Sequence, residues 1–301
     1  MKKNKILSII VITLIYLFVL GAGIGIYYLF PEVLKNQALL MILIIDIICT
    51  ILIYLFSCIF KNASIYDPYW SVIPPIAFTG FILITKYYNI YVLIFMILVI
   101  IWSVRLTLNW ALNFKNLNIQ DWRYQNFRDK HPKTFFLINL FGIHLFPTII
   151  VFVGMLPGFY FIEKAVTSQL NVATIIGFVI MLFATAIELI SDVQLYTFRK
   201  NNQTPGIIMD KGLWKYSRHP NYFGEILFWI SIWLVYFSAE ASLLKGLLLA
   251  SCPIAIFVMF EFISIPMIEK RLLKNKPDYQ AYIDRTNTLL IYPLLKNNKN
   301  K

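Results

Sequence analysis

Three long runs without a charged side chain decide what this chain can fold into. They cover residues 6–30, 134–162 and 165–187. Each exceeds the roughly 18 residues that mark a helix able to cross a bilayer. Charged residues make up only 14% of the chain, against about 25% in an average soluble domain. The sequence therefore predicts a polytopic membrane protein.

The remaining apolar segments give the number of spans. We expect an all-α integral membrane protein, a polytopic bundle of about eight (seven to nine) transmembrane helices. The segment 71–86 is short and contains Pro74 and Pro75, so a half helix is the alternative there. Residues 1–60 would form the first helices, 61–295 the main membrane domain and 296–301 a disordered tail. The expected spans lie near 6–30, 38–60, 71–86, 88–110, 134–161, 172–190, 222–238 and 243–266.

The distribution of positive charge predicts the orientation. With a cytoplasmic amino terminus, one side of the membrane carries 23 lysines and arginines and the other side carries four. This asymmetry agrees with the positive-inside rule, so we expect both termini in the cytoplasm. The net charge of +12 fits loops beside anionic lipid, and we expect no nucleic-acid partner.

Six carboxylates lie in or beside the apolar segments, where ionisable groups are costly and usually functional. Glu188, Asp192 and Arg199 share one face if the sixth span continues as a helix. The alternative is a helix end closed by a salt bridge. Asp46 and His144 are isolated, and we expect each to make an interhelical hydrogen bond rather than to act in catalysis. The six are Asp46, Asp67, Glu188, Asp192, Glu225 and Glu261.

Residues 212–225 place a dense group of polar side chains at the entry to a span. Pro220 suits the first turn of a helix, which puts Arg218 and His219 at the positive end of the helix dipole. Such an end favours an anion. Asn221 and Glu225 lie one turn apart on the same face of this helix, just past the expected anion site. The alternative is an interfacial loop with an aromatic belt.

Two further segments carry candidate residues. Arg105 and Asn109 lie one helical turn apart, and the alternative role for Arg105 is snorkelling to the interface. Later in the chain, a helix broken at Pro266 would free a carbonyl group near Glu261, which is tolerated beside a polar cavity.

The residues at 212–225 read Gly-Leu-Trp-x-Tyr-Ser-Arg-His-Pro-Asn-Tyr-Phe-Gly-Glu, with Glu-x-x-x-Asp-x-x-x-x-x-x-Arg upstream. This pattern resembles the steroid 5-alpha-reductase-like proteins, and more closely their bacterial-type branch, the domain of unknown function 1295. It is similar to the sterol C14 and C7 reductases and, more distantly, to the isoprenylcysteine carboxyl methyltransferases. The resemblance covers about residues 60–295.

The resemblance implies an NADPH-dependent oxidoreductase in a bacterial cytoplasmic membrane, which reduces a conjugated C=C bond of a hydrophobic small molecule. The substrate could be a sterol, a polyprenoid or an enoyl lipid. Asp67, in an Asp-x-x-Trp motif, would polarise the substrate, with Tyr69 or Tyr66 as an alternative donor; a helix cap is the other role for Asp67. No metal is expected. The cofactor-binding residues would be Arg105, Asn109, Asp192, Arg199, Arg218, His219, Asn221, Tyr222 and Glu225.

Two other functions stay open at this point. One is a methyltransferase that uses S-adenosylmethionine, with Arg218 and His219 at the cofactor carboxylate and Glu269 near the substrate. The other is a lipid-binding or transport protein in which the polar stripe forms a path through the membrane. Cofactor binding distinguishes the three functions. The role of Glu188 is open in each of them.

Overall fold

The structure, a computed structural model, describes residues 2–32, 36–167, 171–202, 204 and 206–292. These residues form helices and no strand. Eight helical segments are long and apolar enough to cross a membrane, which confirms the predicted fold class. The predicted tail at 296–301 lies outside the described residues. The eight segments are Asn4–Leu29, Ala38–Ile59, Ala63–Thr85, Ile90–Asn113, Phe135–Ala165, Val172–Asn201, Pro220–Ala239 and Leu243–Asn275.

The chain divides into two compact units, Met1–Gln169 and Leu170–Lys301. The predicted boundary at residue 60 stays a prediction. The first unit contains α1 (Lys2–Leu29), α3 (Ala38–Ile59), the 3-10 helix η1 (Ala63–Ile65), α4 (Tyr69–Thr85), α5 (Ile90–Asn113), α6 (Trp122–Lys130), α7 (Phe135–Leu137), the π-helix η2 (Ile138–Leu145) and α8 (Phe146–Ala165).

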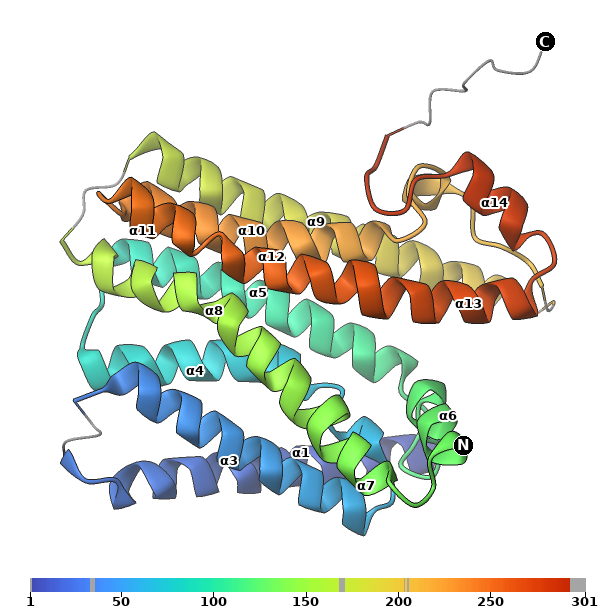
Figure 1. Ribbon diagram of the computed structural model, residues 1–301, viewed down its shortest axis with the longest axis horizontal. Coiled ribbons are helices and arrows are strands. Elements are labelled where there is room, and N and C mark those ends of the chain that lie inside the picture. Colours follow the sequence, from blue (N-terminus) through green and yellow to red (C-terminus); the bar gives the residue numbers. More distant parts are fainter. Residues whose placement is uncertain (1, 33–35, 168–170, 203, 205, 293–301) are drawn as a thin grey trace. The chain divides into compact units, whose positions relative to one another are not determined.

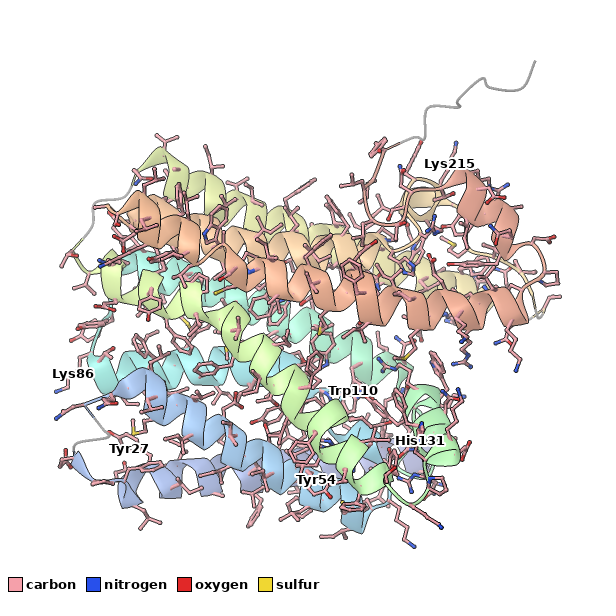
Figure 2. All side chains as sticks on the ribbon, in the orientation of Figure 1. Tyr27, Tyr54, Lys86, Trp110, His131 and Lys215 are labelled. Carbon is pink, nitrogen blue, oxygen red and sulfur yellow. The ribbon has the colours of Figure 1, made fainter. Side chains whose placement is uncertain are left out.

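In the first unit, α3 packs against α1 and α4, and α4 also packs against α5 and α8 (Figure 1). Lys86 and His131 lie at opposite ends of these helices (Figure 2). Short polar side chains begin several of them: Asn89 accepts hydrogen bonds from the first turn of α5, and Asp121 does so for α6. Such caps satisfy backbone N–H groups that have no partner within the helix.

The third span is complete rather than a half helix. Both prolines lie inside α4, and η1 precedes it, so that Ala63–Thr85 reaches 23 residues. The core of this part includes Ile53, Ile65 and Tyr66. The ring of Phe78 packs against Phe95 of α5 and against Phe159 of α8.

The second unit contains α9 (Val172–Asn201), the 3-10 helix η3 (Gly212–Lys215), α10 (Pro220–Ala239), α11 (Leu243–Leu248), α12 (Ser251–Met259), the π-helix η4 (Phe260–Ser264), α13 (Ile265–Asn275) and α14 (Tyr279–Arg285). Because α9 continues unbroken to Asn201, Glu188, Asp192 and Arg199 do lie on one helix, as expected. Pro220 occupies the first turn of α10, also as expected.

The expected break at Pro266 is instead a π-helical turn. η4 ends at Ser264, and Pro266 lies in the first turn of α13. η2 likewise precedes α8, whose first turn contains Pro147. A proline lacks the N–H of the regular helical ladder, and a π-helical turn takes up the local misfit without ending the helix.

Gly224 sets the distance between α9 and α10. A Cβ atom there would lie 2.4 Å from Glu188 Cγ and 2.9 Å from the carbonyl oxygen of Ala184. The backbone of Ala184 cannot move aside as a flexible side chain does. The sequence therefore needs glycine where these two helices meet.

We expect Gly224→Ala to lower the free energy of unfolding by roughly 1–3 kcal/mol, because it overpacks this contact. Thermal unfolding of the detergent-purified protein measures the effect. Gly25→Ala is the matched control, since a Cβ atom there meets nothing within 4 Å. Equal melting temperatures for the two variants would contradict the role of Gly224.

Candidate functional site

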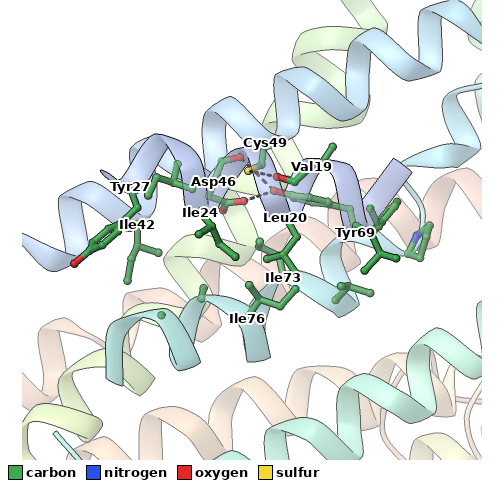
Figure 3. A pocket seen from close by; sticks show the side chains of 18 of the residues that line it. Val19, Leu20, Ile24, Tyr27, Ile42, Asp46, Cys49, Tyr69, Ile73 and Ile76 are labelled. Atoms are coloured by element: carbon green, nitrogen blue, oxygen red, sulfur yellow. Dashed lines mark hydrogen bonds between the residues drawn. The ribbon is translucent and has the colours of Figure 1, made fainter. Parts of the chain in front are cut away.

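A cavity of about 710 Å³ lies within the first unit, between α1, α3, α4 and the later turns of α5. Figure 3 shows its lining, which is mostly aliphatic. The polar members of the lining are few: Thr13, Tyr16, Tyr27, Tyr28, Asp46, Cys49, Tyr69 and Thr107. A mainly apolar pocket with a few polar groups is the usual form of a site for a small molecule.

Asp46 and Tyr69 form the polar centre of this cavity. The Tyr69 hydroxyl donates a hydrogen bond to Asp46 Oδ1 over 2.7 Å, and the two residues are only 3% and 2% exposed. The other carboxylate oxygen, Oδ2, has no hydrogen-bond partner among the described residues. The expected interhelical bond of Asp46 is thus confirmed, and its partner is the tyrosine that we predicted to be catalytic.

A second buried polar group lies one turn further along α3. Thr50 and Thr148 share a hydrogen bond of 2.9 Å, and the Tyr66 hydroxyl reaches Thr148 over 2.8 Å. The Tyr66 ring stacks on Tyr69 at 5.4 Å between centroids. Tyr66, the alternative donor of the sequence analysis, therefore supports the ring of Tyr69.

The expectation for His144 is wrong. Its Nδ1 atom pairs with the carbonyl oxygen of Asn139, 2.8 Å away, and both residues lie in η2. The bond is therefore within one helical segment rather than between two. The centroid of the His144 ring lies 4.7 Å from that of the Tyr66 ring.

Asp67 has a different environment from Tyr69, although only Pro68 separates them. Its Oδ1 atom accepts a hydrogen bond of 2.6 Å from the Tyr124 hydroxyl and lies 4.0 Å from Arg123. Burial, followed by the charge of Asp67, raises the pKa of Tyr124 above its ordinary value, so the phenol remains a donor. No side chain caps α4. Asp67 therefore connects the start of α4 to α6.

Arg105 and Asn109 lie on α5, as expected, one turn apart. Arg105 is buried, and the Asn109 Oδ1 atom accepts a hydrogen bond from Asn113. Their role at the cofactor stays a prediction, because the other predicted cofactor residues belong to the second unit.

In the second unit, Arg218 binds protein groups on every side. Its Nε atom donates to Glu269 over 2.7 Å, and its terminal nitrogens donate to the carbonyl oxygens of Ile283 and Thr286 and to the Thr288 hydroxyl. The backbone N–H of Arg218 donates to the carbonyl oxygen of Asn287. Arg218 therefore holds the segment after α14 against the start of α10.

His219 completes this group. Its Nε2 atom lies 3.0 Å from Glu269, and its backbone N–H donates to the carbonyl oxygen of Thr288. The ring of Tyr222 stacks on His219 at 5.5 Å. The place where we expected an anion is thus partly filled by the chain itself.

One contact joins the polar stripe of α9 to α10, and a second lies within α10. The Asn221 amide lies 3.4 Å from Asp192 Oδ1. One turn on, the Glu225 Oε1 atom accepts a hydrogen bond of 2.8 Å from the Trp229 indole. The structure thus brings together Asp192 and Asn221, which the sequence assigned to one ligand. The part played by Trp229 was not recognised in the sequence.

Positive charge gathers where α9 and α13 end. The charge of Arg199 interacts with Asp192 and with Arg271. Burial, and then the charge of Arg199, lowers the pKa of Lys276 below its ordinary value. Like charges that interact in this way repel one another, and a bound anion would relieve the repulsion. Sequence reasoning missed Arg271 and Lys276, which lie far from Arg199 in the chain.

We expect Glu269→Gln to weaken the hold of Arg218 and His219 on the segment after α14, because the replacement keeps the shape but removes the charge. The melting temperature should fall, and trypsin should cleave this segment sooner. The control is Asp210→Asn, which removes the charge of an exposed pair with Arg285 and should change little. Equal cleavage rates in the two variants would show that Glu269 does not hold the segment.

Comparison with known proteins places the chain in a family. A model for a family described as "Protein of unknown function (DUF1295)" matches residues 53–286. An uncharacterized protein of Schizosaccharomyces pombe, C594.04c, is 25% identical over 248 residues, which cover 75% of this chain and 71% of the relative. No solved structure matches the chain. Since the family model spans most of its length, the chain belongs to the DUF1295 family.

Proposed function

We propose that this protein is an NADPH-dependent membrane oxidoreductase that reduces a C=C bond conjugated to a carbonyl group in a lipid. The observation that carries the proposal is the buried pair of Asp46 and Tyr69 in an apolar cavity. A carboxyl group in such a place is costly and has no packing role that an apolar residue would not fill better.

The geometry of the pair suits the polarisation of a carbonyl group. In its protonated form Asp46 can donate a hydrogen bond from Oδ2 to a substrate oxygen, while Oδ1 continues to accept from Tyr69. The phenol thus keeps the carboxyl group in one orientation. As negative charge develops on the substrate oxygen, this donor stabilises it, and the surrounding apolar side chains strengthen the interaction.

The edge of the cavity supports a substrate that arrives from the bilayer. Several lining residues of α1 and α4 are exposed, among them Ile24 at 53% and Leu83 at 72%. In a membrane protein these side chains face lipid. A hydrophobic substrate can therefore move sideways from the bilayer into the cavity without crossing water.

The residues of the second unit fit a dinucleotide. Arg199, Arg271 and Lys276 would bind its phosphate groups, because their mutual repulsion is relieved by an anion. Asp192 and Asn221, already in contact, offer a carboxylate and an amide to hydroxyl or carboxamide groups. When bound, NADPH would supply a hydride to the electron-poor carbon of the double bond.

We expect Asp46→Asn to lower kcat about 100- to 1,000-fold, the usual effect of removing one donor at a developing oxyanion. The assay follows NADPH oxidation with straight-chain and steroid enones as substrates. Asp67→Asn is the matched control, because Asp67 is not among the described residues that line the cavity. A larger loss in Asp67→Asn than in Asp46→Asn would return the catalytic role to Asp67.

We expect NADPH at 100 times its dissociation constant to stabilise the protein by about 2.7 kcal/mol. Thermal unfolding with NADPH, NADH and S-adenosylmethionine in parallel measures this effect. The shift should be smaller in Arg199→Ala and Asn221→Ala, and unchanged in Arg285→Ala. A shift with S-adenosylmethionine alone would favour a methyltransferase, and no shift with any ligand would favour a binding or transport protein.

A further inference from the structure

The cavity of the first unit is long as well as apolar. Its lining on α1 runs from Ile12 to Tyr28 and on α4 from Pro68 to Ile84. Each stretch advances 16 residues, or about 24 Å along a helix. Tyr27 lies near the Lys86 end of the unit, and Trp110 lies toward the His131 end (Figure 2). The cavity therefore follows α1 and α4 across most of the hydrocarbon layer.

The Asp46 carboxyl group lies near the middle of this length as measured along α1, and the hydroxyl of Tyr69, the first residue of α4, reaches it there. The Cys49 thiol contacts the carbonyl oxygen of Val19 at 3.7 Å, and a Cβ atom on Gly23 would lie 3.3 Å from Ile45. The turn of α3 that carries Asp46 thus faces Val19 and Gly23, halfway along the lining of α1. Cavity remains on both sides of the pair.

The two halves differ in chemistry. We call the half between the polar pair and Tyr28 the outer arm, lined by Ile24, Tyr27, Tyr28, Gly80, Leu83 and Ile84. Its lining is mostly aliphatic, with Tyr27 and Tyr28 toward its end. The other half is lined in part by Thr13, Tyr16, Thr107 and Trp110, which offer polar atoms. A molecule that fits has a polar part near the pair and a long apolar part in the outer arm.

We propose that the substrate is a single-chain lipid, an extended acyl or isoprenoid chain with a conjugated carbonyl group near one end. The carbonyl group binds at Asp46 and Tyr69, and the chain lies in the outer arm. The reductive role of the pair rests on the proposed function, whereas the binding of the chain does not.

Gly80 provides a direct test, because it lines the outer arm and a Cβ atom there meets nothing within 4 Å. Gly80→Phe therefore adds a ring inside the arm without a clash at its Cβ. Gly21→Phe is the matched control. Gly21 is also a mid-helix glycine with open space around its Cβ position, but it does not line the cavity.

The experiment measures binding of straight-chain enones that differ only in tail length, beside a steroid enone, to the protein in nanodiscs. In the wild type, affinity expressed relative to the enone already dissolved in the bilayer should rise with each added methylene group, through added packing contacts, until the tail fills the outer arm. In Gly80→Phe the affinity should stop rising at a shorter tail length. In Gly21→Phe the limiting tail length should equal that of the wild type. The smaller Gly80→Leu, which should give an intermediate limit, replaces Gly80→Phe if that variant does not fold.

Two results would overturn the proposal: the same limiting tail length in the Gly80 variants and the wild type, or tighter binding of the steroid enone than of every straight-chain enone. NADPH oxidation with the same probes separates this inference from the proposed function. Length-dependent binding without oxidation would refute only the reductase. Reduction of the steroid enone with no dependence on tail length would refute only the single-chain substrate.

Discussion

The lack of water in the hydrocarbon layer is the constraint on which this structure depends. A polar group there must find a partner inside the protein, because an unsatisfied one costs several kcal/mol. Buried pairs follow from this: Thr50 with Thr148, and Trp229 with Glu225. Asp46 is satisfied only in part, since Oδ1 accepts from Tyr69 while Oδ2 has no partner among the described residues. An incomplete pair at membrane depth is the feature that most strongly supports a ligand at this place.

The same constraint explains how the helices accommodate proline and glycine. A span cannot stop in the middle of the bilayer without exposing backbone groups, so the misfit of Pro147 and Pro266 is taken up by π-helical turns rather than by breaks. Where α9 and α10 meet, Gly224 lets two backbones approach closely. Inside the bilayer the hydrophobic effect does not drive helices together, because lipid tails are as apolar as the side chains. Close packing of this kind drives their association instead.

The two units carry different chemistry. The first encloses an apolar cavity with one polar pair, suited to a hydrophobic molecule. The second gathers cations where α9 and α13 end, suited to an anion. A lipid reductase needs both, since its cofactor is charged and its substrate is not. Arg218 and Glu269 add a third element, a closed group that holds the chain after α14 in place.

The sequence by itself determined the spans and the helix faces, because both follow from local periodicity and the thickness of the bilayer. It therefore placed Glu188, Asp192 and Arg199 on one helix and Pro220 at the start of another. Only the tertiary structure decided which residues meet between helices. In the folded protein Tyr69 donates a hydrogen bond to Asp46, Tyr124 donates one to Asp67, and Arg218 donates one to Glu269. Residues adjacent in the chain can point to opposite sides of a helix start, and the packing of neighbouring helices, which no spacing records, selects the partner of each.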